Sequence, residues 1–287
     1  YEAKYPDIIK PIYQTENQYS QGKDASKFNF DRARGKYLAF CEGDDYWTDP
    51  GKLQKQVDFL ERHPEYIATV HRVKVINEHG EIIDYPGYSD VVEHVYTIDD
   101  FVRFPLPGQL ASLVMRNIFL TLDPHIQDLY YSCKAKAYGD QKLSLLLALV
   151  GNIYCFSESM TTYRFITAGG TSWAARTYGK NMAYFSYKQS LALWQFAQEA
   201  FGVELPMSML YNQLHCAFFT TLRRPSLSNL KITLKIAIDM PNKHSMILYH
   251  LRKMPYFIKR AIVISRTGHI IQDPVDKTPD YGTPGNR

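Results

Sequence analysis

Three carboxylates in the first quarter of the chain are the residues best suited to carry chemistry. Glu42, Asp44 and Asp45 lie within four positions and follow directly after an apolar run. Carboxylates this close repel one another unless a cation or hydrogen-bond donors gather them. Oxygen ligands select hard divalent cations, and Mg²⁺ is usually held by one or two carboxylates together with substrate phosphates. The spacing therefore predicts a Mg²⁺ or Mn²⁺ site and a phosphorylated substrate.

An acidic turn that only caps the next helix is the structural alternative. Asp49 and Pro50 already form a helix start, because Asp accepts from free backbone N–H groups and proline tolerates the first helical position. The neighbouring Tyr46 and Trp47 add an aromatic surface that a cap does not need. The functional interpretation is therefore favoured.

The carboxylates need elements that position them, and the first half of the chain alternates strand and helix patterns. The apolar run at 36–41 is expected to be a buried strand that delivers the acids at its carboxyl end. An earlier strand is expected at 8–14, a short helix around 28–33, and a helix from Asp49 to His63. The apolar face of that last helix is expected to consist of Leu53, Val57 and Leu60. This alternation is typical of an α/β layer fold.

The downstream pattern adds further strands and then changes to helices. Strands are expected at 66–76 and 81–85, which form a hairpin, and at 110–115, 153–156 and 160–165. Beyond about residue 175 the periodicity is helical throughout. The buried faces expected there are Tyr184, Leu191 and Trp194; Leu210, Leu214 and Ala217; and Leu230, Leu234 and Ile238.

These patterns predict three parts of the chain. Residues 1–175 are expected to form an N-terminally truncated α/β domain and 176–270 a helical extension, whereas 271–287 are expected to be a disordered tail.

The overall composition excludes several classes of protein. A formal charge of +4 over 287 residues is far from the dense basic surface that nonspecific nucleic-acid binding requires. The four cysteines are scattered without a CxxC pair, which predicts neither a zinc site nor a disulfide framework and favours a reducing, cytoplasmic setting. No apolar run reaches the roughly 20 residues of a membrane span. A basic and apolar stretch at 249–266 could contact an anionic membrane surface, although a helix docked on the domain is favoured.

One stretch of the chain resembles the centre of the family 2 glycosyltransferases. The resemblance is carried by ARGKYLAFCEGDDYW at 33–47, followed by Asp49, Pro50, Lys52, Leu53 and Gln56. It implies an α/β domain of the GT-A (Rossmann-like) type, whose acidic DxD-type motif binds the ribose and the metal-diphosphate of a nucleotide sugar. By this resemblance Asp44 is the metal or diphosphate residue and Asp45 supports it. Glu42 replaces the family's first Asp, which keeps a carboxylate but lengthens its reach.

A second segment extends the resemblance. Residues 109–117 resemble the family's acceptor-side strand, which implies acceptor contacts from Gln109 and Ser112 together with Trp47. Asp140 resembles the catalytic base at the head of a helix. Because Asp is a favoured N-cap residue, a purely capping role for Asp140 stays open.

The family's Tyr-Arg segment and the Gly-rich loop after it are similar to Glu158, Tyr163, Arg164, Gly169 and Gly170. Arg164 could fork onto diphosphate oxygens or pair with Glu158, and both interpretations stay open. Lys27 is a further candidate for contact with the diphosphate of the nucleotide sugar.

The resemblance implies an inverting, metal-dependent transfer of a single sugar from a nucleotide-diphosphate sugar to an acceptor hydroxyl, since the QxxRW pattern of processive enzymes is absent. The expected acceptor is a glycan or lipid-linked glycan, in cell-surface polysaccharide or glycolipid synthesis at the inner face of the cell membrane. The family's opening strand has no counterpart before Tyr1, so we expect a missing N-terminal segment and an incomplete donor site, which leaves open whether this chain is active. A nucleotidyltransferase and a noncatalytic nucleotide-sugar or carbohydrate-binding module stay open as alternatives. A P-loop NTPase is disfavoured because no GxxxxGK[ST] run is present.

Overall fold

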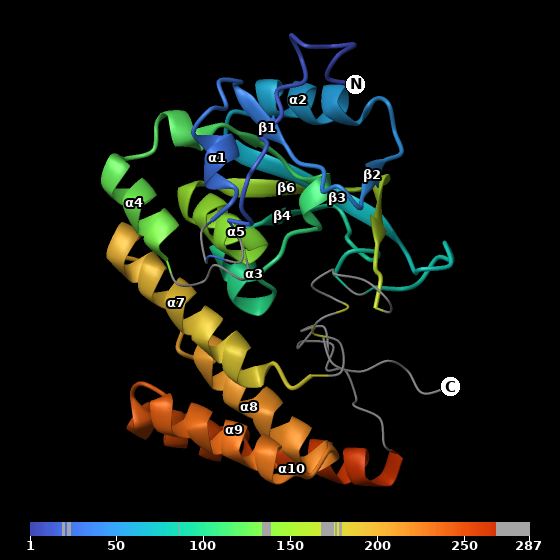
Figure 1. Ribbon diagram of the computed structural model, residues 1–287. Coiled ribbons are helices and arrows are strands. Elements are labelled where there is room, and N and C mark those ends of the chain that lie inside the picture. The colour runs from blue at the N-terminus through green and yellow to red at the C-terminus, as the bar shows by residue number, and fades with distance from the viewer. Residues whose placement is uncertain are drawn as a thin grey trace.

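A six-stranded mixed sheet forms the centre of the chain, in the order β1-β5-β3-β6-β2 with β4 also paired to β6 (Figure 1). The computed structural model describes residues 1–18, 21, 24–85, 87–133, 139–167, 175, 177 and 180–267. The Gly-rich loop at 169–170 and the tail at 271–287 lie outside the described residues. The strands are β1 (Tyr37–Ala39), β2 (Tyr46–Trp47), β3 (Tyr66–Ile76), β4 (His94–Tyr96), β5 (Val114–Arg116) and β6 (Asn152–Arg164).

Helices cover the sheet and then form a separate layer at the end of the chain (Figure 1). The expected α/β class with a helical extension is therefore confirmed. The helices of the first part are α1 (Lys27–Phe30), α2 (Lys52–Arg62), α3 (Ile98–Arg103), α4 (Pro124–Ser132) and α5 (Gly139–Val150), with short 3₁₀ turns η1 (Leu110–Ser112) and η2 (Ile118–Leu120). The helices of the second part are α7 (Ala183–Phe201), α8 (Ser208–Arg223), α9 (Leu227–Asp239) and α10 (Lys243–Thr267).

The parallel pair β3 and β6 lies in the middle of the sheet and brings two carboxyl ends to the same edge. The pairing runs from Tyr66 with Asn152 to Ile76 with Arg164. The other strand pairs are antiparallel. In sheets of this kind, ligands bind at the edge where the carboxyl ends of parallel strands lie.

The helices α2 and α5 cover opposite faces of this sheet. Successive side chains of a strand point to opposite faces. Ala68 and Val70 of β3 pack in the main core together with the leucines of α5. The intervening Thr69 faces α2, where its Oγ1 accepts a hydrogen bond from Gln56 Nε2 at 3.1 Å.

The segment between β1 and β2 crosses from one edge of the sheet to the other. β1 is an edge strand that pairs with β5, whereas β2 lies at the opposite edge and pairs with β6 through Tyr46 and Thr162. Residues 40–45 therefore pass the strand ends that lie between them, and these residues include the three carboxylates.

Two expectations for the N-terminal strands are wrong. Residues 8–14 form no strand, because the amides of Ile8 and Ile9 donate back to the Tyr5 carbonyl at 3.1 and 2.8 Å in a local turn. The strand before the acids is half-buried instead of buried, because β1 has a neighbour on one side only.

The later strands lie where the sequence predicts them, but their lengths differ from the predicted ones. β3 has the expected bounds, but its hairpin partner is reduced to one bridge between Ile76 and Ile82. The run at 110–115 divides into η1 and β5, because Gln109 begins a 3₁₀ turn. The two runs at 153–156 and 160–165 form the single strand β6, which bends through register shifts against β3 near Arg72.

The buried face of α2 is partly polar, so of the expected Leu53, Val57 and Leu60 only Leu60 is fully buried, and Val57 is half-buried. Lys52, Gln56 and Leu60 are buried, and Leu53 is exposed. Lys52 tolerates this position because its amine lies 4.6 Å from the Trp47 ring centre, and burial lowers its pKa to about 8.

The start of α2 also differs from the expected one. The N-cap is Gly51, and the side chain of Asp49, two residues earlier, accepts from the Gly51 amide at 2.7 Å. Asp49 thus stabilises the turn that precedes α2, but it is not the N-cap of the helix. The expected end at His63 is confirmed.

The helix α7 belongs to two cores and so joins the helical layer to the sheet. Leu193 and Phe196 pack in the main core, and Tyr187 packs in a second core among α7, α8, α9 and α10. The expected buried face of α8, with Leu210, Leu214 and Ala217, is confirmed. The residues expected to be buried on α7 are half-buried, and those on α9 are exposed: Tyr184, Leu191 and Trp194; Leu230, Leu234 and Ile238.

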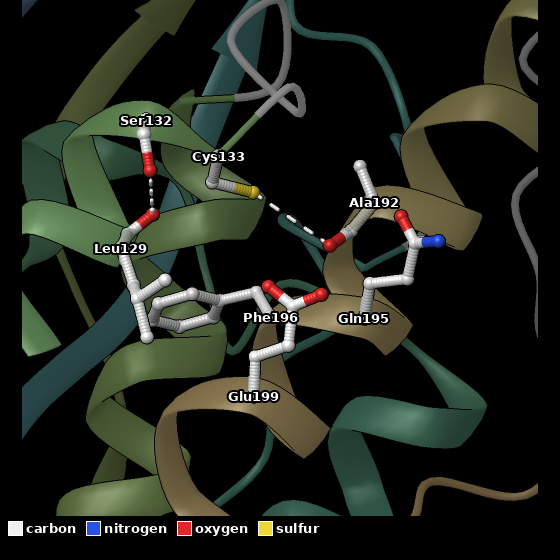
Figure 2. A pocket seen from close by; sticks show the side chains of 7 residues that line it. All are labelled: Leu129, Ser132, Cys133, Ala192, Gln195, Phe196 and Glu199. Carbon is white, nitrogen blue, oxygen red and sulfur yellow. Dashed lines mark hydrogen bonds between the residues drawn. The ribbon is translucent and has the colours of Figure 1, made fainter.

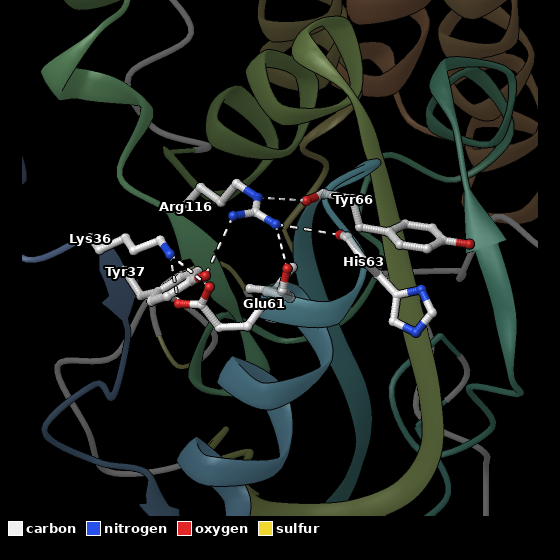
Figure 3. A network of polar contacts seen from close by, with 7 residues as sticks. Lys36, Tyr37, Glu61, His63, Tyr66 and Arg116 are labelled. Atoms are coloured by element: carbon white, nitrogen blue, oxygen red, sulfur yellow. Dashed lines mark hydrogen bonds and ion pairs between the residues drawn. The ribbon is translucent and has the colours of Figure 1, made fainter.

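Arg116 of β5 connects the end of α2 with the edge strand that leads to the acids (Figure 3). Its guanidinium donates to the carbonyls of Leu60, His63 (3.4 Å) and Tyr66 (2.9 Å) and to the Tyr37 hydroxyl (3.4 Å). A cation at a helix C-terminus satisfies its last carbonyls and interacts favourably with the helix dipole. Arg116 thereby fixes α2, β3 and β1 relative to one another.

Replacing Arg116 by Met is expected to lower the free energy of unfolding by about 2–3 kcal/mol, because part-buried carbonyls lose a charged donor. The matched control is Lys36→Met, which removes an exposed ion pair with Glu61 from the same network and should change the free energy little. Urea denaturation followed by circular dichroism measures both. Equal losses for the two variants would contradict the role given to Arg116.

Candidate active site

One side-chain amide gathers two of the three carboxylates. Gln109 Nε2 donates to Glu42 Oε2 at 2.9 Å and to Asp45 Oδ2 at 2.7 Å. Gln109 is buried, and its Oε1 accepts from the Ala111 amide at 2.6 Å, which starts η1. Both ends of the amide are therefore satisfied, and its donor end is fixed between two acids.

The backbone before Gln109 can approach the sheet because Gly108 has no side chain. A Cβ at this position would lie 3.0 Å from Ser112 Oγ and 3.3 Å from Val70 Cβ. The Ser112 hydroxyl also donates to the Gln109 carbonyl at 2.6 Å. Gly108 and Ser112 thus help to place the amide of Gln109 at the carboxyl edge of the sheet.

Burial, together with the charges of neighbouring acids, raises the pKa of two of the carboxylates. Desolvation raises the pKa of Glu42, and the charges of Asp45, Asp140 and Asp44 raise it further, to about 7. Desolvation likewise raises the pKa of Asp45 to about 6, although hydrogen bonds from Arg164 and Gln109 oppose this shift. The cluster is therefore short of positive charge, which is the electrostatic condition that a cation relieves.

The end of β6 supplies the second set of contacts to the acidic loop. The Arg164 amide donates to Asp45 Oδ1 at 3.1 Å, and the Arg164 guanidinium donates to the Asp44 backbone carbonyl. Glu158 forms its ion pair with Lys55. Of the two interpretations of Arg164, pairing with Glu158 is therefore wrong, and its contact with a diphosphate stays a prediction.

Asp140 lies at the start of α5 and close to Glu42, whose pKa its charge raises. It is half-buried, and desolvation raises its own pKa. Asp140 is the second residue of the helix, and its Oδ1 accepts from the Gln141 amide at 2.8 Å. That bond satisfies one free amide of the first turn, and the charge of the same carboxylate acts on Glu42.

The remaining candidate residues have mainly structural contacts. The Trp47 indole donates to the carbonyls of Phe40 (3.2 Å) and Ala111 (3.1 Å), and its ring covers Lys52. Ser112 is buried.

The contacts of Lys27 are with residues outside the acidic cluster. It pairs with Asp31 at 2.7 Å and lies over the Tyr131 ring. Neither contact connects Lys27 with the acidic cluster, so its role at the diphosphate stays a prediction.

Two tyrosines lie beside the acids: Tyr163, which the sequence places only in the Tyr-Arg segment, and Tyr85, which no motif singles out. The charges of Asp45, Glu42 and Asp44 contribute to the raised pKa of Tyr163, and the charge of Asp140 contributes to that of Tyr85. The two rings contact each other edge to face, with centroids 6.3 Å apart. Their distance of 78 positions in a chain that holds 22 tyrosines leaves no local signal for the pair.

A cavity of about 300 Å³ lies between α4 and α7 and is separate from this site (Figure 2). Cys133, Phe196 and Glu199 are among its lining residues, and Cys133 Sγ points to the Ala192 carbonyl at 3.7 Å. None of the acids described above lines it. Its position therefore assigns it no part in the chemistry of the carboxylates.

The carboxylates fit a divalent cation by their chemistry, although no preformed cage is present. Within the described part of the chain, no group of three His, Cys, Asp or Glu side chains has the spacing of a metal site. Asp44 is exposed, whereas both carboxylate oxygens of Asp45 accept protein hydrogen bonds. This set resembles a magnesium site in which one carboxylate acts together with substrate phosphates.

Residues 1–112 match the family described as Glycosyl transferase family 2. This segment contains the acidic loop, Gln109 and Ser112. Residues 1–112 are a family 2 glycosyltransferase domain. The resemblance stated from residues 33–56 is thereby confirmed.

The fold of the chain is similar to that of a solved glycosyltransferase structure, the crystal structure of S. aureus TarS 1-349. The match has a TM-score of 0.55 at 14% sequence identity and covers 93% of this chain and 77% of that chain. The likeness confirms a GT-A-like α/β fold for this chain, followed by C-terminal helices.

Curated relatives match a shorter segment. Uncharacterized proteins from Mycobacterium bovis and from two strains of Mycobacterium tuberculosis are each 50% identical over 82 residues. The match covers 28% of this chain and 22% of each relative's length. In the part of the chain that the structure describes, no helix has the length and apolar character of a membrane span.

Replacing Gln109 by Leu is expected to lower the free energy of unfolding by about 1–3 kcal/mol, because two carboxylates and the Ala111 amide lose a buried partner. Gln54→Leu is the matched control, since Gln54 donates to Asp58 on the exposed side of α2. Chemical denaturation of both variants at pH 7 measures the difference. A loss no greater for Gln109→Leu than for Gln54→Leu would show that the amide does not hold the acids together.

Proposed function

We propose that this glycosyltransferase transfers a single sugar from a nucleotide-diphosphate sugar to an acceptor hydroxyl with inversion, assisted by a divalent cation. One observation supports the proposal above the others: the Gln109 amide holds Glu42 and Asp45 together beside Arg164, and the charge of Asp140 acts on the same cluster. The site thus combines a set of acids suited to hold a cation with a separate carboxylate that can accept a proton.

The donor is assigned to the acidic loop. Asp44 would hold Mn²⁺ or Mg²⁺, and when bound the cation neutralises the charge that develops on the leaving diphosphate. Glu42 and Asp45 shape the loop through Gln109, and Asp45 is fixed by the Arg164 amide. The Arg164 guanidinium holds the Asp44 carbonyl and can also meet phosphate oxygens in a forked geometry.

The acceptor is assigned to the side of Asp140. Its carboxylate takes the proton of the attacking hydroxyl, while the hydroxyl oxygen forms a bond with the anomeric carbon. The bond between that carbon and the diphosphate oxygen breaks, and its electron pair leaves with the nucleotide. Because this is one displacement, the configuration at the anomeric carbon inverts. The raised pKa of Asp140 makes it a better proton acceptor than an exposed Asp.

Several finer assignments belong to the same proposal. Trp47, Gln109 and Ser112 are assigned to the acceptor side, and Lys27 to the donor. The glycosyltransferase domain extends over residues 1–175 and the helical extension over 176–270. The acceptor is a glycan or lipid-linked glycan of cell-surface synthesis, and the protein works in the cytoplasm at the inner face of the membrane. Nucleic acid is not a partner.

Two variants separate donor binding from transfer. Asp44→Asn is expected to weaken Mn²⁺-dependent binding of UDP or GDP at least about tenfold, because the cation loses a charged ligand. Asp140→Asn should leave that binding within about twofold and lower sugar transfer by about 10²–10⁴-fold, because the base is lost. Calorimetric titration measures binding, and product analysis with a panel of nucleotide sugars measures transfer.

Asp58→Asn, on the exposed side of α2, is the control and should change neither quantity. Full transfer by Asp140→Asn would contradict the assignment of the base. Metal-dependent nucleotide binding without any transfer by the wild-type protein would favour a noncatalytic binding module. A nucleotide found on the acceptor in place of a sugar would favour a nucleotidyltransferase.

A further inference from the structure

The helix α9 exposes a continuous apolar stripe to water. The residues that the periodicity predicts to be buried on this helix are exposed, and the helix packs through Ile236 on its other side. The stripe has intervals of three, four and four positions, which align side chains along one side of an α-helix. The exposed fractions of its members lie between 45% and 77%. The stripe consists of Leu227, Leu230, Leu234 and Ile238.

The next helix has a second stripe of the same kind. α10 contacts the second core through Met246 and Tyr249, which lie on its inner side. Its outer side has apolar residues at intervals of four, three and four positions, with exposed fractions between 48% and 58%. These residues are Ile247, Leu251, Met254 and Ile258. Both helices lie at the end of the molecule opposite α2 (Figure 1).

The charged residues of these two helices are almost all basic. Asp239 is the one acidic residue in the sequence from Leu227 to Thr267, and its carboxylate accepts from the Tyr184 hydroxyl at 2.7 Å. The basic residues of the same sequence are Lys231, Lys235, Lys243, Arg252, Lys253, Lys259, Arg260 and Arg266. The first five of these have exposed side chains in the structure. The exposed apolar stripes are therefore accompanied by positive charge and by almost no negative charge.

We propose that the two stripes and their five exposed basic residues form a surface that binds an anionic lipid membrane. Helices with an apolar stripe and flanking Lys and Arg lie in the plane of the membrane interface, with the apolar side chains among the acyl chains and the cations at the headgroups. The described helices include none that could span a membrane, so the contact is peripheral. The surface includes α9 and the first half of α10, and so extends beyond the basic stretch at 249–266.

The charge also argues against a second copy of this chain as the occupant. Two such surfaces brought face to face would each carry the same excess of Lys and Arg, and like charges at an interface repel. An anionic membrane supplies both the apolar phase and the opposite charge. This proposal is independent of the sugar-transfer chemistry, because none of its residues belongs to the acidic site.

Flotation of the full chain with lipid vesicles tests the proposal. Vesicles of phosphatidylcholine with about 30% phosphatidylglycerol should bind the protein at least about tenfold more tightly than pure phosphatidylcholine, and high salt should reduce the difference. Leu230→Ser with Leu234→Ser should lower binding at least about tenfold, because two apolar side chains no longer enter the interface. Lys231→Gln with Lys253→Gln should lower binding to the anionic vesicles and leave the weak binding to neutral vesicles unchanged.

Ile82→Ser is the matched control, because Ile82 is 70% exposed in the sheet domain and outside this surface. It should bind vesicles like the wild type, and circular dichroism verifies that every variant is folded. Equal binding to neutral and anionic vesicles would overturn the proposal. So would self-association in light scattering that the Leu230 and Leu234 changes abolish, if the wild-type protein does not bind vesicles.

Discussion

The hydrogen bonds from the Gln109 amide to Glu42 and Asp45 are the interaction on which the site depends. They hold together two carboxylates that would otherwise repel each other, and they do so from a buried position. The amide is fixed in turn by the start of η1 and by the close approach of Gly108 to β3. A small 3₁₀ turn thus determines the shape of the acidic loop.

The sheet supplies the other constraint, because β1 and β2 lie at opposite edges and the acidic loop must cross between them. The crossing brings the loop to the end of β6, where Arg164 contacts Asp44 and Asp45. Arg116 fixes β1 against α2 and β3 on the way into the loop (Figure 3). The placement of the acids therefore depends on hydrogen bonds donated by Arg164 and Arg116 from other parts of the fold.

The local sequence pattern is sufficient to predict the acidic loop, the bounds of β3 and the helical C-terminal part, because each of them has a strong signal within a few residues. It was insufficient wherever a distant partner decides the outcome. Lys52 is buried because the Trp47 ring lies over it, and an apolar pattern cannot show that. The periodicity of α9 correctly predicts an amphipathic helix, but Leu230 and Leu234 face water because Ile236 takes the place in the core. The hydrogen bonds of Gln109 to Glu42 and Asp45 likewise have no signal in the pattern, and its contact with the acceptor stays a prediction.

Paramagnetic broadening by Mn²⁺ in the presence of UDP or GDP, followed in backbone NMR spectra, tests the central claim most directly. Because the effect decreases steeply with distance from the ion, it locates the bound cation without a transfer assay. The account predicts that the signals of Asp44, Asp45, Gln109 and Arg164 broaden first and that Asp44→Asn removes the effect. Broadening centred elsewhere, for example at the cavity between α4 and α7, would contradict it.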